Sequence, residues 1–161
     1  MSELQWYKGN LHTHTTKSDG DADPKFVTKW YRMHGYDFLV LSDHNHRTMF
    51  EYRPGKRRFK RPLMVPGEEV SVNILQGTVP VHVNGIGISA TIDPIDSRTG
   101  GPDEVVPTLQ ANIDAILESG GIAMINHPNY TWAVDHKSIN QTTIIPSANW
   151  IRSLFRIRRL R

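Results

Sequence analysis

The sequence predicts an α/β domain built around a mostly parallel β-sheet, and three observations lead to this prediction. Strand-like segments alternate along the chain with amphipathic helical segments, the order that is typical of parallel sheets. Residues 37–43 contain a continuous apolar run from Phe38 to Leu41, which favours a parallel strand buried on both faces. The chain has 161 residues, the size of one domain, and this length suffices to bury roughly two-thirds of the unfolded surface around one core.

The first half of the chain is expected to form a strand, a helix and a second strand. Residues 6–12 are the first strand, and Pro24 opens a helix that continues to about His34, because proline suits the first helical turn. The apolar stripe of this helix comprises Phe26, Val27, Trp30 and Tyr31. Gly35 ends the helix, and residues 37–43 follow as the second strand.

The second half adds three strands and one helix. Residues 63–72 and 79–88 are predicted as the third and fourth strands. A loop rich in glycine, proline and aspartate covers residues 91–106, and Pro107 begins a helix after it. The apolar face of that helix comprises Leu109, Ile113, Ile116 and Leu117. Residues 122–126 are the fifth strand.

Composition excludes several classes of protein. The chain contains no cysteine, so it has no disulfide, no thiolate catalysis, no zinc finger and no iron–sulfur cluster. No apolar run approaches the ~20 residues of a membrane span and the N-terminus does not resemble a signal peptide, so a cytoplasmic location without a membrane partner is expected. Five of the 19 basic side chains lie in the last ten residues, and the remaining 14 accompany 16 acidic side chains. The body of the chain is therefore not a general nucleic-acid surface.

Five of the eight histidines lie at the tips or edges of the expected strands: His12, His14, His44, His82 and His127. Side chains two positions apart on a strand face the same way, as in the pair His12 and His14. Carboxylates accompany these histidines: Asp19, Asp43, Glu68 and Glu69. In parallel α/β sheets, functional groups gather at the carboxyl ends of the strands. Imidazole and carboxylate suit zinc, manganese or iron, and such ions can share a bridging carboxylate, so the pattern predicts a metal site.

Each of these residues alone also has a structural interpretation. A single His-x-His is weak evidence, Asp43 could cap the end of its strand, and His127 could be a hydrogen-bonded loop histidine. His34 and His136 are interpreted as surface residues, and the role of His46 is left open. The joint placement of the other histidines at strand ends favours the metal site.

Five motifs, in order along the chain, resemble those of the PHP (polymerase and histidinol phosphatase) family of metal-dependent phosphoesterases. They are GNLHTHTTKSDGDADP, YDFLVLSDHN, VPGEEV, VHVNGIGI and GGIAMINHPN, and they cover roughly residues 8–130. The resemblance implies a distorted seven-stranded (β/α) TIM-like barrel, incomplete here with about five strands, and two or three divalent ions at the strand carboxyl ends. The implied ligands are His12, His14, Asp19, His44, Glu69, His82 and His127.

The family pattern Gly-x-Glu places the bridging carboxylate on Glu69 rather than on Glu68. The resemblance also implies that Asp43 lies outside the ligand set and orients a neighbouring imidazole. The amidohydrolase barrel also opens with His-x-His but continues with a lysine bridge on a later strand. The Asp-His-Asn and Gly-Glu-Glu motifs of this chain favour the PHP interpretation instead.

The end of the chain departs from the family. The last family motif is Asp-x-His, but nothing after His127 matches it, and Asp135 and His136 are adjacent rather than spaced by one residue. A (β/α) barrel also needs about 200 residues or more. We therefore expect residues 1–136 to form a partial metal-binding barrel and residues 137–161 a divergent basic tail.

The tail is expected to contain a short amphipathic helix. Its apolar face comprises Trp150, Ile151, Leu154 and Phe155. This helix could cover the body of the protein, bind a partner, including a second copy of the chain, or result from a truncated or frameshifted reading frame.

Three functions are compatible with the sequence. The first is hydrolysis of a small-molecule phosphoester by a metal-activated water, which needs no serine or cysteine nucleophile. The second is a catalytically impaired metal-binding remnant or scaffold. The third is a nucleic-acid-processing module that uses the tail and the basic run of residues 53–61. Within that run, Arg57 and Arg58 either belong to a solvated loop or attract phosphate near the metal ions.

Overall fold

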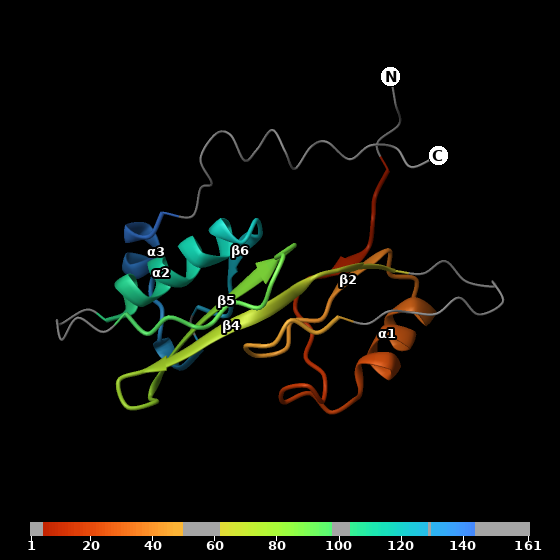
Figure 1. Cartoon of the computed structure of the whole chain (residues 1–161), viewed down its shortest axis with the longest axis horizontal. Coiled ribbons are helices and arrows are strands. Elements are labelled where there is room, and N and C mark those ends of the chain that lie inside the picture. Colours follow the sequence, from red (N-terminus) through yellow and green to blue (C-terminus); the bar gives the residue numbers. More distant parts are fainter. Residues whose placement is uncertain (1–4, 50–61, 98–103, 129, 144–161) are drawn as a thin grey trace, which may run out of the picture.

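The computed structural model describes residues 5–49, 62–97, 104–128 and 130–143. They form a mixed α/β fold (Figure 1). The strands are β1 (Gly9–Asn10), β2 (Phe38–Val40), β3 (Leu63–Val65), β4 (Gly67–Ile74), β5 (Val79–Ile86) and β6 (Ile122–Ile125). The helices are α1 (Pro24–Met33), α2 (Val105–Glu118), α3 (His136–Gln141) and a 3-10 turn, η1 (Tyr130–Trp132). The basic run of residues 53–61 and the tail from residue 144 lie outside the described residues.

The strands form two sheets of three strands each, and only the first is parallel. The order in the first sheet is β1-β2-β3, and in the second β4-β5-β6, with both pairs of the second sheet antiparallel. The expectation of a mostly parallel sheet is therefore correct for the first half of the chain and wrong for the second. The described residues form no closed barrel, so the TIM-like architecture is not reproduced as a whole.

A tight turn makes β4 and β5 antiparallel. Residues 75–78 connect Ile74 directly to Val79, and these two residues are paired in the register. Leu75, Gln76 and Gly77 all have positive φ angles, of 51°, 59° and 86°. A connection this short joins only antiparallel strands, whereas a parallel pair needs a crossover of a dozen or more residues.

The segment before α2 reverses the direction of β6. Residues 87–97 run back along the helix: the Ser89 hydroxyl donates to the Ser119 carbonyl oxygen at its end, and the Ile95 amide donates to Asn112 at its middle. Helix α2 then brings the chain back to the C-terminal end of β5, where Ile122 of β6 pairs with Ile86. The strand that follows must run opposite to β5.

The predicted strand 63–72 is found as two strands that join the two sheets. Pro66 separates β3 from β4, but the pairing of Phe38 with Leu63 continues in the same register to an isolated parallel bridge between His44 and Glu69. On its other side Glu69 pairs with Asn84 of β5. The two sheets therefore meet at Glu69.

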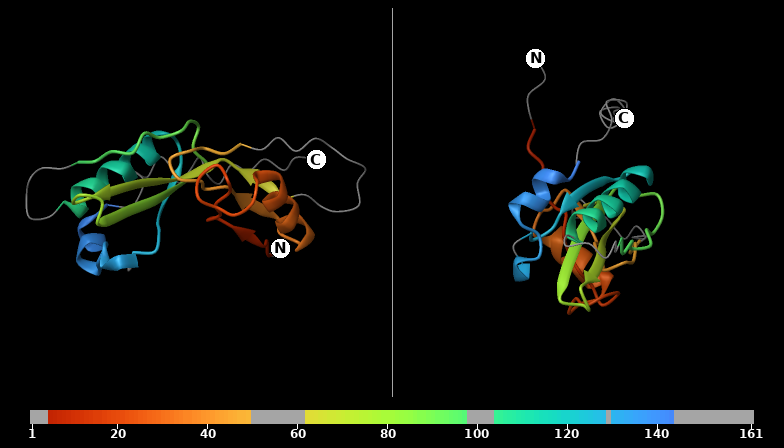
Figure 2. Two further views of the ribbon diagram at one scale, coloured as in Figure 1. Left: turned by 90° about the horizontal axis from the view of Figure 1, so that it is seen from below. Right: turned by 90° about the vertical axis from the view of Figure 1, so that its left-hand side faces the viewer.

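The hydrophobic core lies between the second sheet and α2. Alternate residues of β4, including Val70, Val72 and Ile74, face this core, and Leu109, Ile113 and Ile116 of α2 fill its other side. Figure 2 shows an elongated molecule in which α2 and α3 lie toward one end and α1 toward the other. The intervening residues of β4 and β5 face away from α2, and this second face carries the candidate site.

Both long helices form close to where the sequence predicts them. The Asp23 side chain caps α1 by accepting hydrogen bonds from the Lys25 and Phe26 amides, and Gly35 follows the helix with a φ of 73°. Helix α2 begins two residues before Pro107. Helix α3 packs on α2, and the Thr143 amide donates to the Gln110 side chain at 2.8 Å. The expected domain boundary after residue 136 stays a prediction.

Across the described residues, no helix is long and apolar enough to cross a membrane.

Candidate metal centre

Glu69 lies at the centre of the site because of its position on β4. Strand alternation turns Glu68 toward the core and Glu69 toward the opposite face. The Glu69 side chain is only 1% exposed, although it is a carboxylate. A buried carboxylate needs partners of opposite charge or several hydrogen-bond donors.

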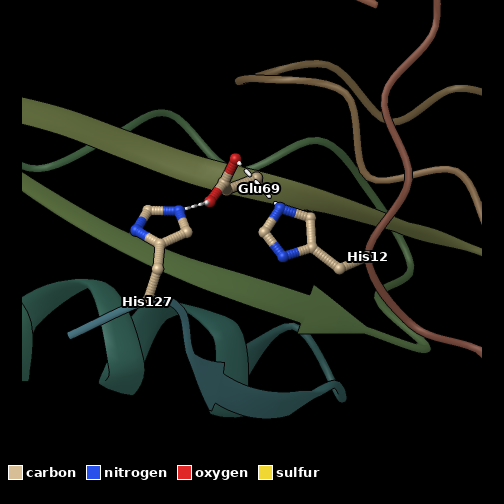
Figure 3. A group of neighbouring side chains, drawn as sticks. All are labelled: His12, Glu69 and His127. Atoms are coloured by element: carbon tan, nitrogen blue, oxygen red, sulfur yellow. Dashed lines mark hydrogen bonds and ion pairs between the residues drawn. The ribbon is translucent and has the colours of Figure 1, made fainter. Parts of the chain in front are cut away.

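Five histidines surround the two carboxylate oxygens of Glu69. Nε2 of His14 and Nδ1 of His44 each lie 3.1 Å from Oε2, and Nε2 of His12 lies 3.5 Å from it. On the other oxygen, Oε1, Nε2 of His127 lies at 3.1 Å and Nδ1 of His82 at 3.4 Å. In Figure 3, His12 and His127 approach the carboxylate from two sides. Each oxygen thus faces its own group of histidines.

The five histidines come from both sheets. His12 and His14 follow β1, His44 follows β2 and His127 follows β6, as expected for ligands at strand ends. His82 instead lies in the middle of β5, opposite Ser71 of β4, and its ring projects from the face that also carries Glu69. His82 reaches the site because its side chain projects from the same face of the antiparallel hairpin as Glu69, and not because it lies at the end of a strand.

Asp19 lies at the edge of the same group. Its Oδ1 is 2.9 Å from Nδ1 of His14, its Oδ2 is 3.5 Å from Nε2 of His44, and its side chain is 68% exposed. The seven predicted ligands and Tyr130 line one cavity of about 250 Å³. The structure therefore brings together every residue that the family resemblance implies as a ligand; that they bind metal stays a prediction.

The polar atoms of this cavity fit divalent cations. Within the described chain, Oε2 of Glu69 and both ring nitrogens of His82 are buried without a hydrogen-bond partner. Unpartnered buried polar atoms are costly, and bound cations would satisfy Oε2 of Glu69 and one ring nitrogen of His82. Two groups have ligand atoms close enough to share an ion: His14, His44 and Glu69, and His12, Glu69 and His127. Imidazole nitrogen with carboxylate oxygen suits zinc, manganese or iron.

Hydrogen bonds and charge set the protonation of the site. Burial alone would raise the pKa of Glu69, but the close imidazoles of His12, His14 and His82 and the hydrogen bond from Asn126 outweigh it and hold that pKa far below its usual value. The adjacent Glu69 carboxylate raises the pKa of His14 against the effect of burial. Burial lowers the pKa of His44. Glu69 is therefore ionised, and a cation that binds to it would compete with the proton of His14.

Asp43 contacts the site through Ser18 rather than through a histidine ring. Its buried carboxylate accepts hydrogen bonds from the Thr15 amide at 2.6 Å, from the Ser18 hydroxyl at 2.9 Å and from the Thr48 hydroxyl. Burial opposes ionisation, but these hydrogen bonds outweigh it and lower the pKa of Asp43. Ser18 in turn lies 3.3 Å from Nδ1 of His14. Asp43 thus anchors the loop that follows His14 rather than orienting an imidazole directly.

That loop also requires a glycine. A Cβ atom at Gly20 would lie 2.5 Å from the carbonyl carbon of His14, closer than any side chain tolerates. The close approach places Asp19, the preceding residue, beside His14.

Several residues of the site were not assigned from the sequence. Tyr130 lines the cavity, with its ring centroid 5.4 Å from that of His127. Ser71 lies 2.6 Å from Nδ1 of His44, and Asn126 donates to Glu69 at 2.6 Å. Asn84 and Asn126 lie inside two of the quoted motifs, close in sequence to His82 and His127, and this proximity could have indicated a role in the site. Nothing in the local sequence distinguishes Tyr130.

Other predicted residues lie outside the cavity. Arg57 and Arg58 are not among the described residues, so their proposed role near phosphate stays a prediction. His34, His46 and His136 are exposed and do not line the cavity, in agreement with the surface interpretation of His34 and His136. Asp135 caps α3, where its side chain accepts from the Ser138 amide, and does not reach the site.

No protein-family model matches the chain, and no curated protein sequence matches it. The solved structures that share its fold include the following two. One is a two-domain protein from Bacteroides vulgatus ATCC 8482, named as containing a predicted PHP-like metal-dependent phosphoesterase, with 19% identity and a TM-score of 0.51. The other is named as a candidate metal-dependent phosphoesterase from Bifidobacterium adolescentis ATCC 15703, with 11% identity and a TM-score of 0.51.

The match covers 79% of this chain and 36% of the first structure, and 86% of this chain and 74% of the second. This chain therefore spans about a third of the first protein and about three-quarters of the second. The resemblance predicted from the sequence motifs is confirmed at the level of the fold.

Proposed function

We propose that this chain is a metal-dependent hydrolase of small-molecule phosphoesters. The observation that carries the proposal is the buried Glu69 carboxylate, whose two oxygens face different groups of histidines. A carboxylate in this position is suited to bridge two cations. The fold shared with proteins named as metal-dependent phosphoesterases supports the same reaction class.

Each residue of the cavity has a part in this proposal. His14, His44 and Asp19 would hold one ion with Glu69, and His12 and His127, which approach different oxygens of the carboxylate, would hold a second ion with it. His82 would complete either group, because its ring nitrogens have no other partner in the described chain. Divalent ions bound there would acidify water and neutralise charge on the phosphoryl oxygens.

The reaction adds water across a phosphoester bond. A bond forms from the water oxygen to phosphorus, the bond from phosphorus to the leaving oxygen breaks, and the departing alcohol gains a proton. The cavity of about 250 Å³ is small by comparison with pockets for large ligands, which favours a phosphoryl group as its occupant. Exposed Asp19 and Tyr130 lie where the remainder of a substrate would leave the cavity.

The test compares two neighbouring glutamates on β4. Metal bound to the purified chain is measured by mass spectrometry. Hydrolysis of p-nitrophenyl phosphate and bis(p-nitrophenyl) phosphate is followed with added manganese, zinc or iron(II). We expect bound metal and metal-dependent turnover in the unaltered chain. Glu69→Gln should lose most of both, since a neutral amide is a poor bridging ligand, whereas Glu68→Gln faces the core and should keep its metal.

Equal loss of metal in both variants would show that the assignment of Glu69 is wrong. An unaltered chain without bound metal and without turnover in any of the three metals would refute the proposed function.

A metal-binding remnant is the second candidate. The observation that favours it is that Asp135 caps α3 and, like His136, does not line the cavity, so neither adds a ligand to the seven found there. Stoichiometric metal without turnover on either phosphoester would support this candidate. Nucleic-acid processing, which depended on residues outside the described chain, stays a prediction that a salt titration of DNA binding can test.

A further inference from the structure

Two buried asparagines connect the Glu69 carboxylate to the backbone beside His12. Nδ2 of Asn126 donates to Oε1 of Glu69 at 2.6 Å and to Oδ1 of Asn84 at 2.7 Å. Nδ2 of Asn84 donates to the carbonyl oxygen of Leu11 at 2.8 Å. Asn84 is fully buried and Asn126 is 4% exposed, so these hydrogen bonds are shielded from water. We call this chain of hydrogen bonds the asparagine relay.

The direction of the asparagine relay is fixed by its ends. The Leu11 carbonyl can only accept, so Asn84 must turn its NH₂ group toward it and its oxygen toward Asn126. Ionised Glu69 also only accepts, so the NH₂ group of Asn126 serves both neighbours. Reversal of either amide would bring oxygen against oxygen at hydrogen-bond distance. The relay therefore has one possible arrangement.

The relay makes the two oxygens of Glu69 different. Oε1 receives the Asn126 hydrogen bond, whereas no described residue donates a well-directed hydrogen bond to Oε2. The terminal torsion of a glutamate is broad, so little in the side chain itself prevents the carboxylate from rotating. Hydrogen bonds within a buried network restrain such motion. Oδ1 of Asn126 itself has no partner among the described residues, so the restraint comes from the two hydrogen bonds that its NH₂ group donates. The Asn126 hydrogen bond thus holds Oε2 toward His14 and His44 and leaves Oε1 beside His127.

We propose that Asn126, supported by Asn84, is a positioning residue that holds the Glu69 carboxylate in a bridging orientation, so that two ions are bound at once. The inference rests on the proposed metal site. Without the relay, the carboxylate would turn both oxygens toward one cation. The ion shared by His12 and His127 would then lose its carboxylate ligand, while His14, His44 and Asp19 would retain the other.

The test is a cobalt(II) titration of the full chain after metal removal, followed by calorimetry and visible absorption. We expect the unaltered chain to bind at least two ions. Asn126→Leu has the same number of side-chain heavy atoms, although it is larger, and it has no donor. It should weaken the binding of one ion about 10–100-fold, the usual effect of losing such a supporting contact. The other ion should keep its Kd within about threefold.

Asn112→Leu is the matched control. Asn112 is also buried, and its side-chain amide donates hydrogen bonds to the carbonyl oxygens of Ile95 and Thr108. It lies on α2, however, and does not line the cavity. Its loss should lower stability and leave both cobalt affinities unchanged. Asn84→Val keeps the Asn126–Glu69 hydrogen bond but removes the Asn84 amide that accepts from Asn126 and donates to the Leu11 carbonyl, and it should weaken the binding of the same ion by a smaller factor. This second variant carries the test if Asn126→Leu does not fold.

The outcomes separate the inference from the proposed function. Unaltered affinities for both ions in the Asn126→Leu or Asn84→Val variant would overturn the inference, as would an equal change in Asn112→Leu. If the unaltered chain binds only one ion, the inference is wrong, but the proposed function remains possible with a mononuclear site. Absence of cobalt binding in the unaltered chain would refute the proposed function itself.

Discussion

Glu68 and Glu69 are consecutive residues with opposite electrostatic environments. Glu69 faces five histidines, and the nearness of His12, His14 and His82, with the Asn126 hydrogen bond, lowers its pKa against the effect of burial. Glu68 faces the core, where burial raises its pKa to about 7, against a hydrogen bond from the Ile92 amide and the positive charge of Arg47. Oε2 of Glu68 has no hydrogen-bond partner among the residues that the structure describes. Strand alternation alone thus separates a carboxylate suited to bind cations from one that is costly to ionise.

This difference predicts the pH dependence of stability in the protein without bound metal. Glu68 has a pKa of about 7 when folded and an ordinary value of 4.5, so the folded state holds the proton more tightly. Its contribution to stability is fully present below about pH 4.5 and is lost as the pH rises through 7. Glu68→Gln should therefore raise the free energy of unfolding by about 1–3 kcal/mol at pH 8 and change it little at pH 5.

Urea unfolding at the two pH values, in the presence of a chelator, measures this difference. Glu118→Gln, at the exposed end of α2, is the control and should show no such pH dependence. A Glu68→Gln variant that is less stable than the unaltered chain at pH 8 would contradict the expected cost of ionising Glu68.

At the scale of elements, short-range patterns predict where helices and strands lie but not how the strands pair. The apolar spacing of Leu109, Ile113 and Ile116 predicts α2, and all three are fully buried against the second sheet. The direction of β6 instead depends on the return of residues 87–97 along α2, which no local pattern reveals. The hairpin at residues 75–78 is different: its glycine and its shortness indicate an antiparallel pair, and the β-α-β interpretation overlooked this signal.

Packing of α2 should affect stability without affecting the candidate site. Ile113→Ala leaves a cavity in the core and should lower the free energy of unfolding by about 2–5 kcal/mol. Because α2 covers the face of the sheet opposite Glu69, the number of bound metal ions should not change. Denaturant unfolding and metal analysis of the folded variant test both statements. Asp114→Ala, at the next, exposed position, should stay within about 0.5 kcal/mol of the unaltered chain.

At the scale of the whole molecule, the site collects its side chains from both sheets. His12, His14 and His44 follow strands of the first sheet, while His82 and His127 belong to the second. Their convergence could be predicted from the sequence because most of them lie where strands end. Contacts such as Asn126 with Glu69 could not, since they depend on the pairing of β5 with β6 across residues far apart in the chain.

Ions bound between the two sheets should stabilise the whole fold. An ion present at about 100 times its Kd adds about 2.7 kcal/mol to the free energy of unfolding. For a domain of this size, that energy corresponds to a rise in Tm of about 5–10 °C. Thermal unfolding with manganese or zinc, and then with excess EDTA, should show this difference. Glu69→Gln should show little or none of it, and an equal effect of EDTA on both proteins would mean that the ions bind elsewhere.

The backbone of Glu69 belongs to both sheets, and this has a consequence for how the protein opens. Its amide donates to the Asp43 carbonyl at 3.1 Å, its carbonyl accepts from the Asn45 amide at 2.9 Å, and on its other side it pairs with Asn84. Without ions, we expect the first sheet to separate from β4 while the second stays folded, so that the amide hydrogens of β2 exchange with solvent through a partial opening. Ions held by side chains from both sheets would remove that partial opening. Hydrogen exchange in β2 would then require the same global unfolding as exchange in β5, and the two halves would become a single cooperative unit.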